Sequence, residues 1–251
     1  MIYDFSGLGF AAGDVVVITG AASGIGRATA LTAARSGLTV IGWDLDDARL
    51  AGIQAEITAA GGTAHSVRCD VTDPDQIAAA WQATAALGDP IYLVNNAGPP
   101  SGTPLSVAQG LVQGAASMAA VTDNWLSQFG GVAVATTFTA SISGTYVSPQ
   151  AGHTWYPMAK AAIAAYARHL AVSRRGRPRA NVVAPGLTAT PRTEALLATE
   201  VGQAMAKGIP SGRIGEADDQ AAAIMFLLSP AASHVNGVTV PVDGGSILAG
   251  G

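Results

Sequence analysis

A tyrosine and a lysine stand four residues apart in the run Tyr156-Pro157-Met158-Ala159-Lys160. Four residues is the spacing that places two side chains on one face of a helix. A positive charge beside a phenol stabilises the phenolate, so it is expected to lower the phenol pKa from about 10 toward the range of an acid–base catalyst. A surface helix with an amphipathic lysine would give the same spacing. The spacing alone does not distinguish a catalytic pair from a surface helix, so the other motifs of the chain have to decide.

A glycine-rich turn, Thr19-Gly20-Ala21-Ala22-Ser23-Gly24-Ile25-Gly26, joins a predicted first strand to a predicted first helix. Glycines at such a turn let the backbone approach a pyrophosphate, whose charge then faces the helix N-terminus. The spacing differs from the commoner G-x-G-x-x-G fingerprint, and strand–helix turns favour glycine in any case. Ser23 is suited to bond a phosphate or to cap the helix.

Asp44 stands at the end of the predicted second strand. A carboxylate in this place accepts the ribose hydroxyls of a dinucleotide and repels a 2′-phosphate, which favours NAD over NADP. Arg27 is the residue that would serve a 2′-phosphate instead. Asp44 is also explained as an acidic residue that starts a loop, since Asp46 and Asp47 follow it.

Short apolar runs alternate with longer helical patterns along the whole chain, and no linker or repeat interrupts them. Strands are predicted at 14–19, 39–43, 65–69, 91–94, 132–138, 180–184 and 238–242. Helices are predicted at 24–36, 46–60, 73–87, 105–129, 156–174, 192–207 and 216–228. This order predicts one α/β domain over residues 1–251, built on a doubly wound parallel sheet.

The composition narrows the classes of function. The formal net charge is −4 without a basic block, which argues against nucleic acid as a partner. The single cysteine, Cys69, excludes an intramolecular disulfide framework, and its apolar surroundings predict a buried structural thiol. The four histidines lack a metal-ligand partner at helical spacing, so no metal site is expected. The N-terminus has no basic leader and no apolar run reaches membrane-spanning length, so we expect a soluble, cytoplasmic protein without membrane partners.

Taken together, these motifs resemble the classical short-chain dehydrogenase/reductase family, from about Val15 to Gly245. The matching segments are the T-G-x-x-x-G-x-G turn at 19–26, Cys69-Asp70-Val71, Asn95-Asn96-Ala97-Gly98, the Y-x-x-x-K pair, the Pro185-Gly186 turn that runs on to Pro191, and Val242-Asp243-Gly244-Gly245. The resemblance implies a Rossmann-type fold, a nicotinamide cofactor, a small alcohol or ketone substrate and a homo-oligomer, a tetramer or a dimer.

The resemblance also implies roles for individual residues. Tyr156 would exchange a proton with the substrate oxygen, Lys160 would lower the tyrosine pKa and bind the nicotinamide ribose, and a serine at the end of strand five would orient the carbonyl. The implied cofactor contacts are Gly20, Ser23, Gly24, Ile25, Gly26, Asp44, Asp70, Val71, Asn96, Ala97, Gly98, Tyr156, Lys160, Pro185, Gly186, Thr188 and Thr190. Thr190 would bind the carboxamide.

Two serines compete for the catalytic position. Ser141 forms the family's S-x-x-G pattern with Gly144, whereas Ser143 has the commoner spacing of thirteen residues before Tyr156. We favour Ser141, because a loop absorbs two extra residues more easily than a strand end does. The family's asparagine in the helix after strand four, which holds a water of the proton relay to the lysine, is missing. Either Gln109 or Gln113 replaces it, or the relay is absent.

The function predicted from the sequence is an NAD-dependent oxidoreductase that interconverts a secondary alcohol and a ketone. The segment from 191 to 212 is expected to form a substrate lid, with Gly202, Gly208 and Pro210 as hinges and apolar residues that suit a hydrophobic substrate. The alternative is a catalytically silent dinucleotide-binding regulatory protein. An epimerase or dehydratase would need a larger C-terminal substrate domain.

Overall fold

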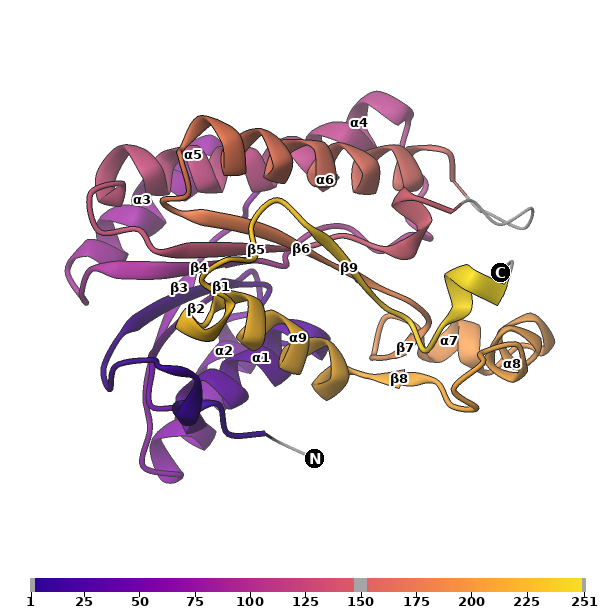
Figure 1. Cartoon of the computed structure of the whole chain (residues 1–251), viewed down its shortest axis with the longest axis horizontal. Helices are drawn as coiled ribbons and strands as arrows, with labels where there is room; N and C mark the ends of the chain where they lie inside the picture. Colours follow the sequence, from indigo (N-terminus) through magenta and orange to yellow (C-terminus); the bar gives the residue numbers. More distant parts are fainter. Residues whose placement is uncertain (1–2, 147–152, 250–251) are drawn as a thin grey trace.

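The computed structural model describes residues 3–146 and 153–249, and its centre is a seven-stranded sheet in which every neighbouring pair is parallel. The strand order is β3-β2-β1-β4-β5-β6-β9 (Figure 1). The strands are β1 (Val15–Thr19), β2 (Thr39–Asp44), β3 (Thr63–Arg68), β4 (Pro90–Asn95), β5 (Ala135–Thr139), β6 (Arg179–Pro185) and β9 (Thr239–Val242). The order reverses between β1 and β4, and in open sheets this switch point is where ligands bind.

The strands are buried because helices cover both faces of the sheet. In Figure 1, α1 (Gly24–Arg35), α2 (Asp47–Ala59) and α9 (Ala217–Leu228) lie below it, and α3 (Pro74–Ala85), α5 (Ser117–Phe129) and α6 (Trp155–Ser173) lie above it. Each layer has its own apolar core, with Leu31, Ile53 and Ile224 in one and Trp81, Trp125 and Ile163 in the other. Burial on both faces explains the continuous apolar runs of the sequence. The predicted doubly wound fold is confirmed.

The long helix predicted at 105–129 is in fact three pieces. These are α4 (Val107–Leu111), the π-helical segment η2 (Val112–Ala116) and α5. Gly110 and Gly114 bring the first two pieces against α6. A Cβ at Gly110 would lie 2.4 Å from the Cβ of Trp155, and one at Gly114 would lie 3.1 Å from the Cβ of Ala159. The closest approach to α6, the helix that carries Tyr156, is at Gly110 of α4, and the wider π turn follows directly after it.

Other boundaries also differ from the predictions. β5 begins at Ala135 instead of residue 132, because the end of α5 continues into a turn in which Val132 N–H donates to the Phe129 carbonyl at 2.9 Å. β3 ends at Arg68, which leaves Cys69 in the following loop. The short 3-10 helices are η1 (Ser6–Leu8), η3 (Ile142–Gly144), η4 (Pro230–Ala232) and η5 (Ser246–Ala249).

The segment after β6 forms a small layer of its own beyond the carboxyl ends of the strands, at the right of Figure 1. It contains β7 (Thr188–Ala189), α7 (Glu194–Leu197), α8 (Glu200–Lys207) and β8 (Gly215–Glu216), with β7 and β8 paired in parallel. A Cβ at Gly202 would lie 2.1 Å from the Leu196 carbonyl oxygen, so this glycine allows α8 to pack on α7. Within the described residues, no helix has the length and apolarity needed to cross a membrane.

Candidate active site

The glycine-rich turn lies between β1 and α1, next to the end of β4. Gly20 and Gly24 have φ angles of 68° and 52°, a region that side chains disfavour. A Cβ at Gly26 would lie 2.0 Å from the Gly20 carbonyl oxygen, so the turn closes only with glycine there. Ser23 is the N-cap residue of α1, but its side chain makes no capping hydrogen bond. The helix-capping role of Ser23 is therefore not seen, and its side chain leaves the first N–H groups of α1 uncapped.

Asp44 is directed back at this turn. One carboxylate oxygen accepts a hydrogen bond from Ala22 N–H at 3.0 Å, and the other accepts from Leu45 N–H at 2.8 Å. Arg27, the candidate partner for a 2′-phosphate, instead forms an ion pair with Glu56 of α2. The Asp44 carboxylate thus lies beside the turn, while the Arg27 guanidinium is paired with Glu56.

The residues that follow β4 are fastened to the turn by hydrogen bonds. The Thr19 hydroxyl accepts from the backbone N–H groups of both Asn96 and Ala97 at 3.0 Å. The Asn96 side-chain amide donates to the carbonyls of Thr19 and Gly20 at 3.2 and 3.3 Å. These bonds place Gly98 at the mouth of the switch point between β1 and β4.

Asp70 and Val71 lie in the loop after β3. The Asp70 carboxylate accepts from the backbone N–H and the hydroxyl of Thr72 at 2.9 and 2.7 Å. Val71 is buried, and Asp70 N–H donates to the side chain of Gln76 at 3.1 Å. The loop is therefore rigidly held at the same end of the sheet as the glycine-rich turn.

The turn after β6 closes the opposite side of the site. Gly186 allows Asp243 to approach, since a Cβ there would lie 2.7 Å from the Asp243 Cβ. Buried Thr188 donates to the Gly186 carbonyl at 3.0 Å. The Thr190 methyl would meet a Cβ at Gly24 at 3.3 Å, so the turn that begins with Pro185 reaches the glycine-rich turn.

Tyr156 and Lys160 are in the first turns of α6, as their spacing predicts. Tyr156 is partly buried, and the Lys160 Nζ atom lies 5.4 Å from the centroid of its ring. Lys160 is buried, and its Nζ donates to the Thr139 carbonyl at the end of β5 at 3.0 Å. The pair is therefore aimed at the carboxyl edge of the sheet.

The sequence predicts that Lys160 lowers the pKa of the Tyr156 phenol, and this prediction is wrong. The pKa of Tyr156 is raised, because burial disfavours the phenolate more than a hydrogen bond from Ser141 and the charge of Arg192 favour it. Burial, together with the smaller effect of the Arg192 charge, lowers the pKa of Lys160 to about 8. Desolvation thus outweighs the mutual stabilisation that the sequence suggests.

Ser141 is the serine that contacts the tyrosine. Its hydroxyl bonds to the Tyr156 side chain and accepts from Ser143 N–H at 3.2 Å. Gly144 makes this approach possible, because a Cβ there would lie 2.9 Å from the backbone of Lys160 and Ala161. Ser141 and Lys160 therefore both lie beside Tyr156, near the end of β5, while Ser143 contributes a backbone group.

The two glutamines considered as replacements for the missing asparagine have different surroundings. Gln109 is exposed, and its side-chain oxygen accepts from Ser106 in a capping box. Gln113 is half-buried on η2, which packs against α6, and its backbone carbonyl accepts from the Ser117 hydroxyl at 2.7 Å. Both α4 and η2 pack against α6, so burial is the difference that the structure shows between the two glutamines.

Other residues have structural roles. Trp43 is fully buried, donates to the Thr84 hydroxyl at 3.2 Å and packs edge-on against Trp81. Burial raises the pKa of the Cys69 thiol to about 12, which makes it a poor nucleophile. In the described ranges, no group of three or more His, Cys, Asp or Glu side chains is arranged to hold a metal ion.

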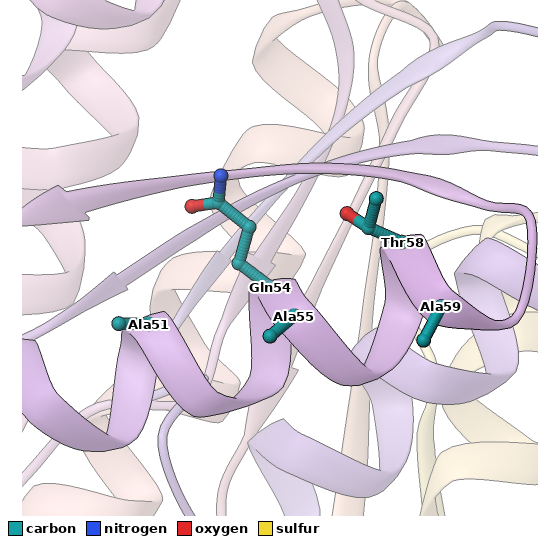
Figure 2. A pocket seen from close by; sticks show the side chains of 5 residues that line it. All are labelled: Ala51, Gln54, Ala55, Thr58 and Ala59. Carbon is teal, nitrogen blue, oxygen red and sulfur yellow. The ribbon is translucent and has the colours of Figure 1, made fainter.

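A shallow surface hollow lies outside the site. It is lined by Ala51, Gln54, Ala55, Thr58 and Ala59, and Figure 2 shows all five on the single helix α2. It contains none of the predicted site residues.

One residue of the site could not be assigned from the sequence. Arg192, two residues after Thr190, donates from Nη1 to the Gly98 carbonyl at 2.8 Å and affects the pKa of both Tyr156 and Lys160. The only signal in the sequence is its place just after the Pro185–Pro191 motif.

The chain is similar to known proteins over most of its length. The family model described as enoyl-(acyl carrier protein) reductase matches residues 20–246. The 7alpha-hydroxysteroid dehydrogenase of Escherichia coli (strain K12) is 32% identical over 246 residues, which cover 94% of each chain. A solved structure of a 7alpha-hydroxysteroid dehydrogenase with NADH and 7-oxo glycochenodeoxycholic acid has a TM-score of 0.87 at 28% identity, covering 97% of this chain and 98% of the other.

A second solved structure carries the other form of the cofactor. It comes from Beutenbergia cavernae and is described as a candidate NAD(P)-dependent gluconate 5-dehydrogenase with bound NADP. It has a TM-score of 0.88 at 30% identity and covers 96% of this chain and 99% of that one. The sequence motifs, the sheet and these similarities agree, and the chain belongs to the classical short-chain dehydrogenase/reductase family.

Proposed function

We propose that this protein transfers a hydride between NAD(H) and a secondary alcohol or ketone, with Tyr156 as the general acid and base. The observation that carries the proposal is the meeting of Ser141, Tyr156 and Lys160 at the end of β5. A phenol with a raised pKa is protonated at neutral pH, which suits the donor of a proton to a carbonyl oxygen.

The residues around the glycine-rich turn fit a dinucleotide. The uncapped amide edge of α1 suits a pyrophosphate, and the Asp44 carboxylate suits the adenosine ribose. Asp70 and Val71 would contact the adenine, and Thr188 and Thr190 the nicotinamide end. A bound nicotinamide cofactor would supply the hydride in reduction and accept it in oxidation.

We infer NAD in preference to NADP from two charges. Asp44 would repel a 2′-phosphate, and the Arg27 guanidinium that could attract one is paired with Glu56. The similar structures hold NADH in one case and NADP in another, so the cofactor has to be measured on this protein.

In the reductive direction, each residue has one task. Ser141 donates a hydrogen bond to the carbonyl oxygen and stabilises the charge that develops on it. Tyr156 donates its proton to that oxygen, and the Lys160 ammonium stabilises the phenolate that remains. In oxidation, Tyr156 takes the proton from the alcohol.

The test begins with purified protein titrated with NADH and NADPH, followed by nicotinamide fluorescence, and continues with a panel of ketones. Tyr156→Phe should keep NADH affinity and lower turnover about 10²- to 10⁴-fold, the usual contribution of a general acid. The control is Tyr166→Phe, since this tyrosine of the same helix bonds Asp123 at 2.6 Å outside the site. Equal turnover of wild type and Tyr156→Phe would remove Tyr156 from the mechanism.

The alternative is a dinucleotide-binding regulatory protein without turnover. Its supporting feature is the missing asparagine of the helix after β4. Tight NADH binding with no oxidation of NADH by any ketone of the panel would favour this alternative.

We also propose that the protein is cytoplasmic and forms a homo-oligomer, a tetramer or a dimer. Light scattering coupled to size-exclusion chromatography would determine its size.

A further inference from the structure

Arg192 connects the segment after β7 to the turn after β4. It follows β7, and its guanidinium donates to the carbonyl of Gly98, a residue 94 positions away in the turn after β4. Gly98 belongs to the β4 side of the switch point, and Arg192 belongs to the segment that leads into α7. Because Gly98 is one of the expected cofactor contacts, Arg192 lies next to the place proposed for the reacting end of the cofactor.

The charge of Arg192 has no counter-ion within the described part of the chain, because none of the ion pairs there includes it. Its hydrogen-bond acceptor, the Gly98 carbonyl, is neutral. Arg213, at the far end of the same segment, forms two hydrogen bonds to the Asp219 carboxylate at 2.6 and 2.7 Å. A guanidinium has five N–H donors in a fork that matches a carboxylate. Most of the donors of Arg192 therefore remain available to a ligand.

The same charge is close to the groups that carry out the proposed chemistry. Arg192 lowers the pKa of Tyr156 and of Lys160, so its field reaches both side chains. Two cations that face one cleft repel each other unless an anion lies between or beside them. An anionic group on the substrate would relieve this repulsion and form charge-assisted hydrogen bonds.

The segment beyond Arg192 offers an apolar surface. Leu196 of α7 and Val201 and Met205 of α8 are exposed, and both helices lie at the same end of the sheet as the site (Figure 1). A ligand that combines a carboxylate with an apolar body would match the guanidinium and this surface together.

We propose that Arg192 is a specificity-determining residue that binds the carboxylate of a keto acid or hydroxy acid while the carbonyl or hydroxyl lies at Ser141 and Tyr156. This proposal rests on the proposed function for the reacting end of the substrate. In it, the Arg192–Gly98 hydrogen bond is exchanged for a bidentate bond to the carboxylate when the substrate enters.

The kinetic experiment compares wild type with Arg192→Gln on substrates that differ in charge. The anionic ketones are 4-oxopentanoate and 5-oxohexanoate, and the neutral ketone of similar size is 2-hexanone. In the variant, KM for an anionic ketone should be roughly 10- to 100-fold higher, because a charge-assisted hydrogen bond is lost. KM for 2-hexanone should stay within about twofold of the wild-type value. Lys207→Gln, which removes an exposed cation from α8, is the matched control and should change neither.

A binding experiment keeps the result independent of turnover. The NADH complex is titrated with hexanoate and with hexanamide, and the change in nicotinamide fluorescence is followed. Wild type should bind hexanoate more tightly than hexanamide, and Arg192→Gln should lose that preference. If no ketone is reduced but this preference is present and depends on Arg192, the proposed function fails and the carboxylate site stands.

Three results would overturn the proposal. The first is a wild type that binds hexanoate and hexanamide equally. The second is an equal loss of activity on 2-hexanone and on the anionic ketones in Arg192→Gln. The third is a weaker NADH affinity in that variant with no change in charge preference, which would assign Arg192 to the pyrophosphate of the cofactor.

Discussion

Lys160 donates a hydrogen bond of 3.0 Å from Nζ to the carbonyl oxygen of Thr139, two residues before Ser141. The bond ties the first turns of α6 to the last residue of β5. It fixes the ammonium in a buried place near the Tyr156 ring, where neither group is fully hydrated. The site is thus assembled from the end of β5 and the start of α6, which are close to each other both in the sequence and in space.

Burial of Lys160 makes stability depend on pH. Its pKa is about 8 in the folded protein, below its ordinary 10.5. Between these values the unfolded chain holds a proton that the folded chain lacks, so the free energy of unfolding rises with pH across this window. Below pH 8 Lys160 is protonated in both the folded and the unfolded state. The burial of its charge then lowers the free energy of unfolding by its full amount.

Lys160→Met should remove that dependence. We expect the stability of wild type relative to the variant to increase by up to about 3 kcal/mol between pH 7 and pH 10. Urea denaturation of both proteins at several pH values measures the difference, and Lys207→Met controls for an exposed lysine. A constant difference across this range would contradict a lowered pKa.

Ser141 and Ser143 should contribute unequally to turnover. Ser141→Ala removes the hydroxyl that bonds Tyr156, so we expect kcat to fall about 10²- to 10³-fold, as for loss of an oxyanion donor. The same change should move the pH profile of alcohol oxidation upward, because the bond favours the phenolate. Ser143→Ala keeps the backbone N–H that donates to Ser141 and should stay within a few-fold of wild type. The opposite ranking would assign the role to Ser143.

Cofactor preference should follow the charge of Asp44. Asp44→Asn retains a side-chain oxygen for the Ala22 N–H but removes the negative charge, so NADPH affinity should rise about tenfold relative to NADH. Fluorescence titration of both cofactors measures this ratio. Asp47→Asn removes an exposed charge from α2 and serves as control. An unchanged ratio in Asp44→Asn would show that Asp44 does not face the ribose.

Glu56→Gln tests the other half of the charge argument. The variant frees Arg27 from its ion pair, and the guanidinium should then attract a 2′-phosphate. We expect tighter NADPH binding with NADH binding unchanged. A combined Asp44→Asn and Glu56→Gln variant should bind NADPH more tightly than either single variant does. No gain for NADPH in any of the three would remove Arg27 from the adenosine end of the site.

Two glycines in helices should respond in opposite ways to alanine. Gly110→Ala places a Cβ against Trp155, so we expect destabilisation of roughly 1–3 kcal/mol and a lower Tm. Gly52→Ala on α2 meets nothing within 4 Å and should stabilise by roughly 0.5–1 kcal/mol through helix propensity. Thermal denaturation of both variants measures the contrast. A stable Gly110→Ala variant would mean that α4 and α6 separate easily.

The sequence by itself determined the order of strands and helices, the glycine-rich turn and the stacking of Tyr156 with Lys160. These features depend on local rules, since apolar periodicity, glycine at a tight turn and a four-residue spacing act over a few neighbouring residues. The same rules missed the π segment at 112–116 and the late start of β5. Both depend on which residues of another element pack against them.

Only the tertiary structure decided the electrostatics of the site. The spacing of Tyr156 and Lys160 suggested a lowered phenol pKa, but burial by residues from several elements raises it. The hydrogen bond between Ser141, which the sequence already favoured, and Tyr156 is seen only in the structure, as is the bond of Arg192 to a carbonyl 94 residues away. Desolvation and long-range hydrogen bonds are properties of the packed chain, because they arise from every element that surrounds a group.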